Sequence, residues 1–387
     1  MSLGPIELLL LVAALVAIVA KRFRLPYSIG LIAAGVVLSL SPRVAGISLS
    51  RHLLFSVLLP PLIFEAALYI HWDELKKNLW IIISLATIGV VLSAAVTGLG
   101  LHYLAKWEWS SAVLFGILIA ATDPVSVIAT FKEVGKRGRL RFLLEAESLF
   151  NDGTAAVAFA VGIAYVAGGT MGSLKVGLLT VETIGGGVLC GVAVAGAVLL
   201  LAGRTDDHLV EITLTTLSAF GSFLLAEHFG FSGVLATLTA GIVVGNFGPD
   251  RAISQKGQIA VESFWEYAAF VATSFVFLLL GIAETKYSFF GLWRTAVLAV
   301  ALVLLGRAAA VYFTLLLFSR SSYRVSLQSQ HVLFWGGLRG ALALALALSL
   351  PLEVPRRQEI ITVCFAVVAF SVFVQGLTVM PLVRRAE

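Results

Sequence analysis

Two carboxylates with polar neighbours stand inside strongly apolar segments of this chain. Asp123 lies in the run Ala121-Thr122-Asp123-Pro124-Val125, and Asp152 ends the run Glu147-Ser148-Leu149-Phe150-Asn151-Asp152. Placing an ionised carboxylate in hydrocarbon costs about 2.5–3.5 kcal/mol on insertion scales. Carboxylates placed at such a cost are by default candidates for binding an ion or a proton, so both aspartates are candidate site residues.

The residues around the two aspartates suit a monovalent cation that competes with a proton. A hard cation such as Na⁺ prefers oxygen ligands, which Thr122, Ser148 and unwound backbone carbonyl groups could supply beside the carboxylates. Ser148 and Asp152 are four residues apart, on one face of a helix, and Asn151 adds an amide. A low-dielectric cavity favours the protonated carboxyl group, so the same groups could carry protons. The alternative is a purely structural polar contact between two helices.

Four further charged residues lie in apolar segments. Glu65 follows a proline pair and could orient the site, bind the ion through water, or pack as a protonated acid. Glu147 and Arg307 are the candidate ion pair, although Arg307 is expected to lie deeper than Glu147. A structural role is favoured for the pair, because an unpaired arginine would be very unfavourable there. Arg339 lies in the glycine cluster 336–340, where its charge could neutralise helix-end dipoles or simply support the structure.

The composition indicates a membrane protein. Of 387 residues, 59% are hydrophobic and 13% are charged, against about 25% charged in soluble domains. The apolar runs are long enough for helices rather than barrel strands, and nucleic-acid binding is not expected despite the net charge of +5. We predict an all-α polytopic protein of about thirteen transmembrane helices, without a soluble domain. The segments span approximately 5–20, 27–41, 53–70, 79–101, 110–130, 143–167, 177–201, 210–228, 231–247, 263–283, 291–318, 329–349 and 358–382.

The placement of basic residues predicts the orientation. Most of the 27 lysines and arginines fall in alternate loops, with a concentration in the loop 131–142. The positive-inside rule then places the N-terminus outside and the C-terminus in the cytoplasm. Lys21 and Arg22 follow the first apolar run, which we therefore interpret as a retained helix rather than a cleaved signal. We expect a multi-pass protein of a plasma (inner) membrane.

Two of the predicted helices carry an interruption. Pro124 removes a backbone donor and crowds the preceding turn, so the fifth segment should break at Thr122-Asp123. The cluster Gly336-Gly337-Leu338-Arg339-Gly340 interrupts the twelfth. Thirteen segments can be divided into six, a linker helix and six inverted, and the fifth then corresponds to the twelfth. Interrupted segments at corresponding positions of two repeats indicate the binding site of a transporter.

On these motifs the sequence resembles the sodium/proton exchangers of the monovalent cation:proton antiporter superfamily, in the NhaP/NHE-type branch. The matching motifs are Thr122-Asp123-Pro124, the run from Glu147 to Gly153, the glycine cluster 336–340 and Phe373-Val374-Gln375-Gly376-Leu377-Thr378. The resemblance implies an NhaA-like antiporter fold in which helices 5 and 12 unwind and cross. It implies that Asp152 is the essential ion-binding carboxylate.

The resemblance also implies the remaining roles in the site. The predicted ion- and proton-binding residues are Asp152, Asp123, Ser148, Thr122, Glu65 and Asn151. Na⁺ would be bound by Asp123, Asp152, Ser148 and the Thr122 carbonyl group, with Glu65 acting through hydrogen bonds or water. Glu147 and Arg307 would be a structural pair. Asn151 stands where electrogenic relatives have a second aspartate, which suggests electroneutral exchange of one cation for one proton.

The resemblance further implies how the protein works as a whole. It implies a homodimer in which a core domain moves against a dimerisation domain. The core would comprise helices 4–6 and 11–13 (about 79–167 and 291–382), and the dimerisation domain helices 1–3 and 7–10 (about 1–70 and 177–283). Na⁺ and H⁺ would be transported, with Li⁺ as a further cation. We expect neither a cofactor nor enzymatic activity.

Three alternatives to Na⁺/H⁺ exchange stay open at this point. A K⁺/H⁺ antiporter of the same fold would show the same motifs. An intramembrane aspartyl protease also uses two aspartates on adjacent helices, although Asp123 lacks a Gly-x-Gly-Asp context. A passive cation channel would conduct Na⁺ without moving protons in return.

Overall fold

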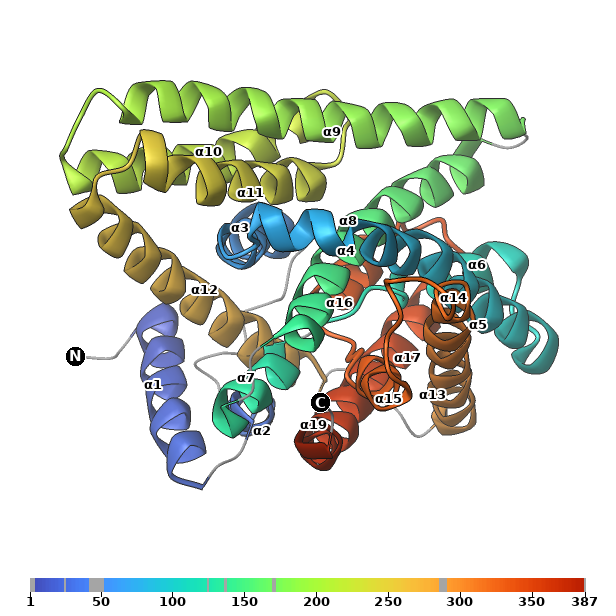
Figure 1. Cartoon of the computed structure of the whole chain (residues 1–387). Coiled ribbons are helices and arrows are strands. Elements are labelled where there is room, and N and C mark those ends of the chain that lie inside the picture. Colours follow the sequence, from blue (N-terminus) through green and yellow to red (C-terminus); the bar gives the residue numbers. More distant parts are fainter. Residues whose placement is uncertain are drawn as a thin grey trace. The chain divides into compact units, whose positions relative to one another are not determined.

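Helices are the regular elements of the part of the chain that the structure describes (Figure 1). This computed structural model describes residues 4–23, 26–41, 52–123, 125–135, 138–168, 172–284 and 291–385. Pro124, to which the predicted break was attributed, lies outside these residues. The all-α prediction is confirmed.

Many of these helices are long and apolar. Seven in the described ranges could cross a membrane by length and composition: Trp72–Ala105, Arg139–Val166, Leu174–Ala202, His208–His228, Gln255–Ala283, Trp293–Leu316 and Arg357–Thr378. Shorter apolar helices span Tyr27–Ser39, Leu53–Leu68, Trp109–Leu118 and Gly233–Pro249. Helix is present in each of the thirteen predicted ranges. The number of membrane crossings and the inverted repeats remain predictions.

The chain divides into two compact units. The first comprises Met1–Arg51, Trp80–Asn151 and Thr273–Glu387, and the second His52–Leu79 and Asp152–Ala272. Three helices contribute to both units: α4 (Trp72–Ser84), α8 (Arg139–Gly168) and α12 (Gln255–Glu284). The functional division into a core and a dimerisation domain remains a prediction.

The first unit contains both ends of the chain and the interrupted helices. Its other helices are α1 (Pro5–Phe23), α2 (Tyr27–Ser39), α5 (Val90–Ala105), α6 (Trp109–Leu118), α7 (Val125–Val134), α13 (Trp293–Ala308), α14 (Thr314–Leu316), α15 (Leu327–Trp335), α16 (Ala341–Leu348), α17 (Arg357–Phe370), α18 (Gly376–Thr378) and α19 (Met380–Arg385). Helix α5 packs against both α6 and α13. A Cβ atom added to Gly116 would lie 2.4 Å from the Ala94 carbonyl oxygen, so this contact requires a glycine.

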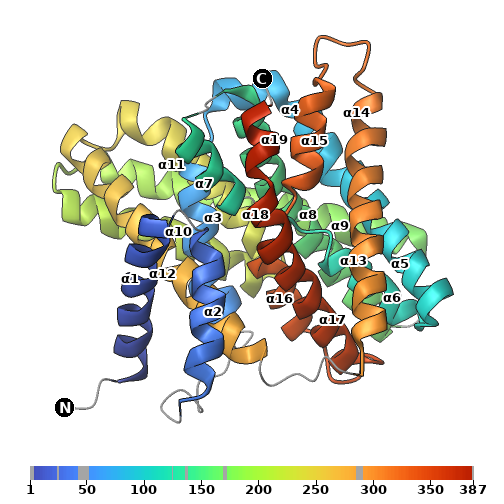
Figure 2. The ribbon, with the colours of Figure 1, turned by 90° about the horizontal axis from the view of Figure 1, so that it is seen from below.

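Short π-helical segments interrupt three long helices of the first unit. They are η3 (Leu85–Gly89), η4 (Ala309–Phe313) and η5 (Ser371–Gln375). Single π-helical turns often occur at functional sites because they redirect side chains and backbone groups. The helix that contains η5 runs beside α13 and α15 (Figure 2).

The second unit is built on a layer of long helices. It holds η2 (Leu53–Leu58), α3 (Leu59–Leu68), α9 (Ser173–Ala202), α10 (His208–His228) and α11 (Gly233–Arg251). Helices α9, α10 and α11 lie side by side (Figure 1). The α10–α11 turn contains Gly230 at φ 75°, a left-handed conformation that suits glycine. Phe64, Val244 and Trp265 belong to the buried core of this unit.

The helix that contains α4 begins earlier than the sequence suggested. The fourth predicted apolar segment starts near residue 79, after Lys76 and Lys77, but α4 begins at Trp72. Asp73 lies in its first turn, where a negative side chain interacts favourably with the helix dipole. Lys76 lies one turn later, with its Nζ atom 3.6 Å from Asp73. The charged residues form the first turns of the helix rather than a loop.

Both predicted interruptions are present. Helix α6 ends at Leu118 and α7 starts at Val125. Helix α15 ends at Trp335 and α16 starts at Ala341, so the glycine cluster is not helical. Two non-helical segments, residues 119–123 and 336–340, therefore lie within the first unit.

Candidate functional site

The two non-helical segments meet at Asp123. The Asp123 amide N–H donates to the Leu338 carbonyl group at 2.8 Å. Gly340 lies against the same residue: an added Cβ atom would stand 2.1 Å from Asp123 Oδ2. The interruption in one helix is thus tied directly to the interruption in the other, as expected for a crossing of unwound helices.

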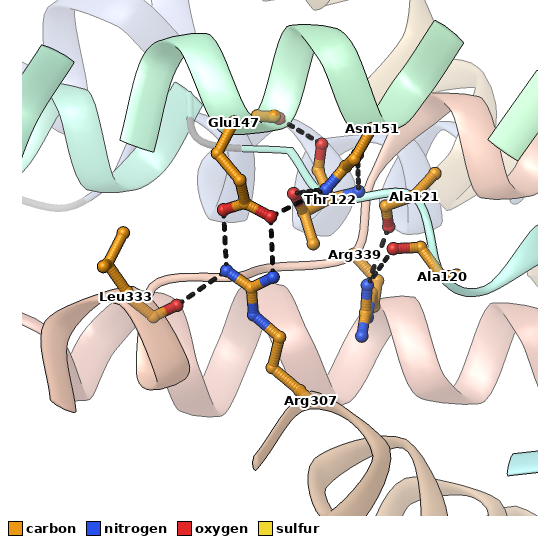
Figure 3. Close-up of polar contacts among 9 residues, drawn as sticks. Ala120, Ala121, Thr122, Glu147, Asn151, Arg307, Leu333 and Arg339 are labelled. Carbon is orange, nitrogen blue, oxygen red and sulfur yellow. Dashed lines mark hydrogen bonds and ion pairs between the residues drawn. The ribbon is translucent and has the colours of Figure 1, made fainter. Parts of the chain in front are cut away.

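Arg339 places its positive charge next to the carbonyl groups that follow α6. Its Nη1 atom donates to the carbonyl oxygens of Ala120 at 2.6 Å and Ala121 at 3.0 Å (Figure 3). The side chain is 2% exposed. Carbonyl groups beyond a helix end carry partial negative charge and need donors. Arg339 supplies both a donor and a compensating charge.

Thr122 is held from α8 through its backbone and its side chain. The Ser148 hydroxyl group donates to the Thr122 carbonyl group. The Thr122 N–H donates to Asn151 Oδ1 at 3.1 Å, and Asn151 Nδ2 donates to Thr122 Oγ1 at 2.7 Å (Figure 3). All three side chains are buried. The structure therefore brings together three of the predicted site residues: Thr122, Ser148 and Asn151.

Glu147 and Arg307 form a buried ion pair with two parallel hydrogen bonds. Arg307 Nη1 lies 2.7 Å from Glu147 Oε1, and Nη2 lies 2.8 Å from Oε2. Arg307 Nη2 also donates to the Leu333 carbonyl group at 2.8 Å, near the end of α15 (Figure 3). Asn151 Nδ2 donates to Glu147 Oε1 at 3.1 Å. The pair thus links α13, α15 and α8, while its structural role remains a prediction.

The remaining predicted residues are divided between the two units. Asp123 is half-buried in the non-helical segment 119–123 of the first unit. Asp152 follows Asn151 in α8, is half-buried and belongs to the second unit. Glu65 is half-buried in α3, also in the second unit. The ligand roles of these three carboxylates remain predictions.

The sequence assigned no role to two residues at the crossing, although one of them, Gln375, lies in the motif 373–378. Ser371 and Gln375 contact the interrupted helix α15–α16 and are buried, at 1% and 3% exposure. Their signal is that they are polar residues in an otherwise apolar segment. The backbone partners Ala120 and Leu333 have no sequence signal, since a carbonyl group is present at every residue.

The interrupted region of the first unit brings several oxygen donors together. Asp123 contributes a carboxylate, and Thr122 and Ser148 contribute hydroxyl and carbonyl oxygens close by. Oxygen donors of this type suit hard cations. Two arginine charges lie in the same region: Arg307 is paired with Glu147, and Arg339 donates to backbone carbonyl groups.

The comparisons with known sequences agree on one family. The family described as "Sodium/hydrogen exchanger, transmembrane" matches residues 9–385. The low-affinity Na⁺/H⁺ antiporter NhaS1 of Synechocystis is 39% identical over 361 residues, covering 92% of this chain and 68% of that protein. The Na⁺/H⁺ antiporter ApNhaP of Aphanothece halophytica is 38% identical, covering 95% of this chain and 71% of the relative.

A solved structure shares the fold. The sodium proton antiporter MjNhaP1 of Methanocaldococcus jannaschii aligns with a TM-score of 0.79 at 21% sequence identity. The alignment covers 98% of this chain and 97% of that one. At this level of identity the likeness shows the fold alone.

Proposed function

Because the chain belongs to the sodium/hydrogen exchanger family, we propose that it exchanges Na⁺ for H⁺ across a membrane by alternating access. The observation that carries this proposal is the hydrogen bond from Asp123 to Leu338, which joins two interrupted helices. Interrupted helices that meet inside a bundle expose backbone and side-chain groups to a transported ion. Such backbone is tolerated at membrane depth only where protein or water surrounds it.

The proposed mechanism is competition at one carboxylate. Asp152 binds either a proton or Na⁺, and both loaded forms are close to neutral. Each can change its access from one side of the membrane to the other. The empty, charged carboxylate does not, because moving a bare charge through hydrocarbon is costly. Exchange follows without a separate coupling device.

Other residues complete the proposed site. Asp123, Ser148 and the Thr122 carbonyl group are ligands of Na⁺, with Glu65 acting through hydrogen bonds or water. Asn151 positions Thr122, which is supported by its hydrogen bonds to the backbone and hydroxyl group of that residue. The Glu147–Arg307 pair acts structurally, in keeping with its burial.

Several features of the proposal concern the protein as a whole. We propose electroneutral exchange of one cation for one proton, in a homodimer whose core domain moves against a dimerisation domain. The protein lies in a plasma (inner) membrane, with its N-terminus outside and its C-terminus in the cytoplasm. These features rest on the motifs and on the placement of positive residues in the sequence.

Among the alternatives, K⁺/H⁺ exchange uses the same mechanism and differs only in the cation. The aspartyl protease is not favoured, because the family consists of transporters. A channel is also not favoured, since the relatives are named as antiporters.

The test is proton flux in proteoliposomes that contain a pH-sensitive dye. Addition of Na⁺ outside should make the lumen alkaline, as protons leave while Na⁺ enters. Li⁺, K⁺ and choline are compared in parallel. A response to K⁺ alone would identify K⁺ as the exchanged cation and leave the proposed mechanism unchanged. An absence of response to every cation, from folded and inserted protein, would contradict the proposal.

A further inference from the structure

We propose that Ser371 and Gln375, on the π-helical segment η5, are positioning residues that hold the interrupted helix α15–α16 in the geometry needed for cation binding. The inference rests on the proposed exchange function and adds two residues to its site. Ser371 and Gln375 are four residues apart and lie on one face of their helix. Both belong to the first unit, together with α15 and α16.

The two side chains satisfy backbone groups on both sides of the interruption. Gln375 Nε2 donates to the carbonyl group of Trp335, the last residue of α15, at 3.1 Å. The Ser371 hydroxyl oxygen accepts from the Arg339 N–H at 2.9 Å, just before α16 begins. A helix that stops inside a bundle leaves terminal backbone groups without helical partners. One turn of the neighbouring helix replaces two of these lost partners.

Ser371 and Gln375 also bind each other. The Ser371 hydroxyl group donates to Gln375 Oε1 at 2.5 Å, which leaves the amide nitrogen of Gln375 for Trp335. Ser371 therefore accepts from one half of the interruption and orients the side chain that binds the other half. Removal of either residue disturbs both contacts, because each member fixes the other.

Arg339 connects Ser371 to the proposed ion-binding residues. Ser371 binds the N–H of Arg339, whose guanidinium group binds the carbonyl groups of Ala120 and Ala121. The adjoining residue, Leu338, accepts from the Asp123 N–H. Displacement of residues 338–339 would therefore move the backbone on both sides of Thr122.

The expected consequence differs for the two transported ions. A proton needs one carboxylate, whereas Na⁺ needs several oxygen ligands at fixed distances. Loosening the interruption should weaken Na⁺ binding more than proton binding. Loss of one buried hydrogen bond corresponds to about a fivefold change in affinity.

The experiment compares Ser371→Ala and Gln375→Met with the wild type and a matched control. Gln375→Met keeps the length of the side chain and removes both polar groups, while Ser371→Ala is a minimal change that preserves folding. The control is Thr362→Val, because Thr362 is also buried and its hydroxyl group donates to the Gln358 carbonyl group of its own helix. The double variant Ser371→Ala/Gln375→Met is included.

Two quantities are measured on each purified variant. Hydrogen–deuterium exchange of peptides covering residues 119–123 and 336–341 reports directly on the Asp123 and Arg339 amides. The Na⁺ dependence of proton flux in proteoliposomes separates KM from the maximal rate. We expect faster amide exchange in both peptides and a KM for Na⁺ raised about fivefold. The double variant should be no worse than the more severe single variant, and Thr362→Val should match the wild type.

Two results would overturn the inference. One is unchanged amide exchange in both single variants. The other applies when the wild type exchanges ions: faster amide exchange in the variants together with a KM for Na⁺ that stays within twofold of the wild-type value. Failure of the wild type to exchange ions would instead contradict the proposed function, and amide exchange would still decide whether Ser371 and Gln375 hold the interruption.

Discussion

At the residue scale, Thr122 shows how the interruption of a helix is made tolerable inside a bundle. Its N–H, carbonyl and hydroxyl groups all have partners on α8, supplied by Asn151 and Ser148. These hydrogen bonds replace the helical hydrogen bonds that are lost at the break. Backbone groups without access to water require such partners. Asn151, expected from the sequence as part of the ion site, uses its amide on Thr122 and Glu147. These hydrogen bonds support the Thr122 backbone, and the expected role of Asn151 in the ion site remains a prediction.

The substitution Asp152→Asn tests the proposed ion-binding carboxylate. Asparagine keeps the shape but neither binds a proton near neutral pH nor carries the negative charge that Na⁺ requires. We expect proton flux in response to Na⁺ to fall to the background of empty liposomes, with an unchanged melting temperature in detergent. Asp206→Asn, at an exposed position, is the matched control and should retain wild-type flux. Flux retained in Asp152→Asn would remove Asp152 from its role.

The substitution Glu147→Gln tests the buried ion pair. It leaves the Arg307 charge buried without its counter-charge, which costs about 3–5 kcal/mol. We expect a marked fall in melting temperature. Glu359→Gln breaks the more exposed pair with Arg356 and should cost roughly 0–1 kcal/mol. Equal melting temperatures for the two variants would show that burial of the Glu147–Arg307 pair does not matter for stability.

At the element scale, the sequence predicted where helices break better than what holds the broken ends. Pro124 and the glycines at 336–340 disfavour helix for local reasons, so both interruptions could be located in advance. The partners could not, because they depend on tertiary packing. Arg339 binds two carbonyl groups of alanine residues, and nothing about alanine indicates such a role.

Helix α4 illustrates the opposite error at the element scale. Hydropathy alone placed its start after the two lysines, yet the helix includes them. An apolar run marks the part of a helix that suits hydrocarbon, whereas hydrogen bonding and charge placement determine where the helix begins. Helix boundaries near charged residues are therefore the least predictable part of this fold.

The substitution Gly340→Ala tests the close approach of the interrupted helices. Its Cβ atom would stand 2.3 Å from Asp123 Cβ and 2.1 Å from Oδ2, so the two non-helical segments must move apart. We expect loss of exchange and a lower melting temperature. Gly196→Ala on α9 is the control, because an added Cβ atom there meets nothing within 4 Å and alanine favours helix. Wild-type exchange in Gly340→Ala would show that the contact is dispensable.

At the scale of the whole molecule, the proposed stoichiometry has an electrical consequence. Exchange of one Na⁺ for one H⁺ moves no net charge. The rate of proton flux should therefore be the same when the membrane potential is clamped at zero or at either sign with K⁺ and valinomycin. A rate that follows the imposed potential would show that charge moves in each cycle, and would contradict the electroneutral assignment drawn from Asn151.

The central claim is that one site holds either Na⁺ or a proton, and the most direct test is the KM for Na⁺ measured across pH. Protons compete more strongly as the pH falls, so the KM should rise, by about tenfold per pH unit below the pKa of the site. The maximal rate at saturating Na⁺ should stay nearly constant over the same range. A KM that does not depend on pH would contradict the competition mechanism, because Na⁺ and the proton would then bind independently.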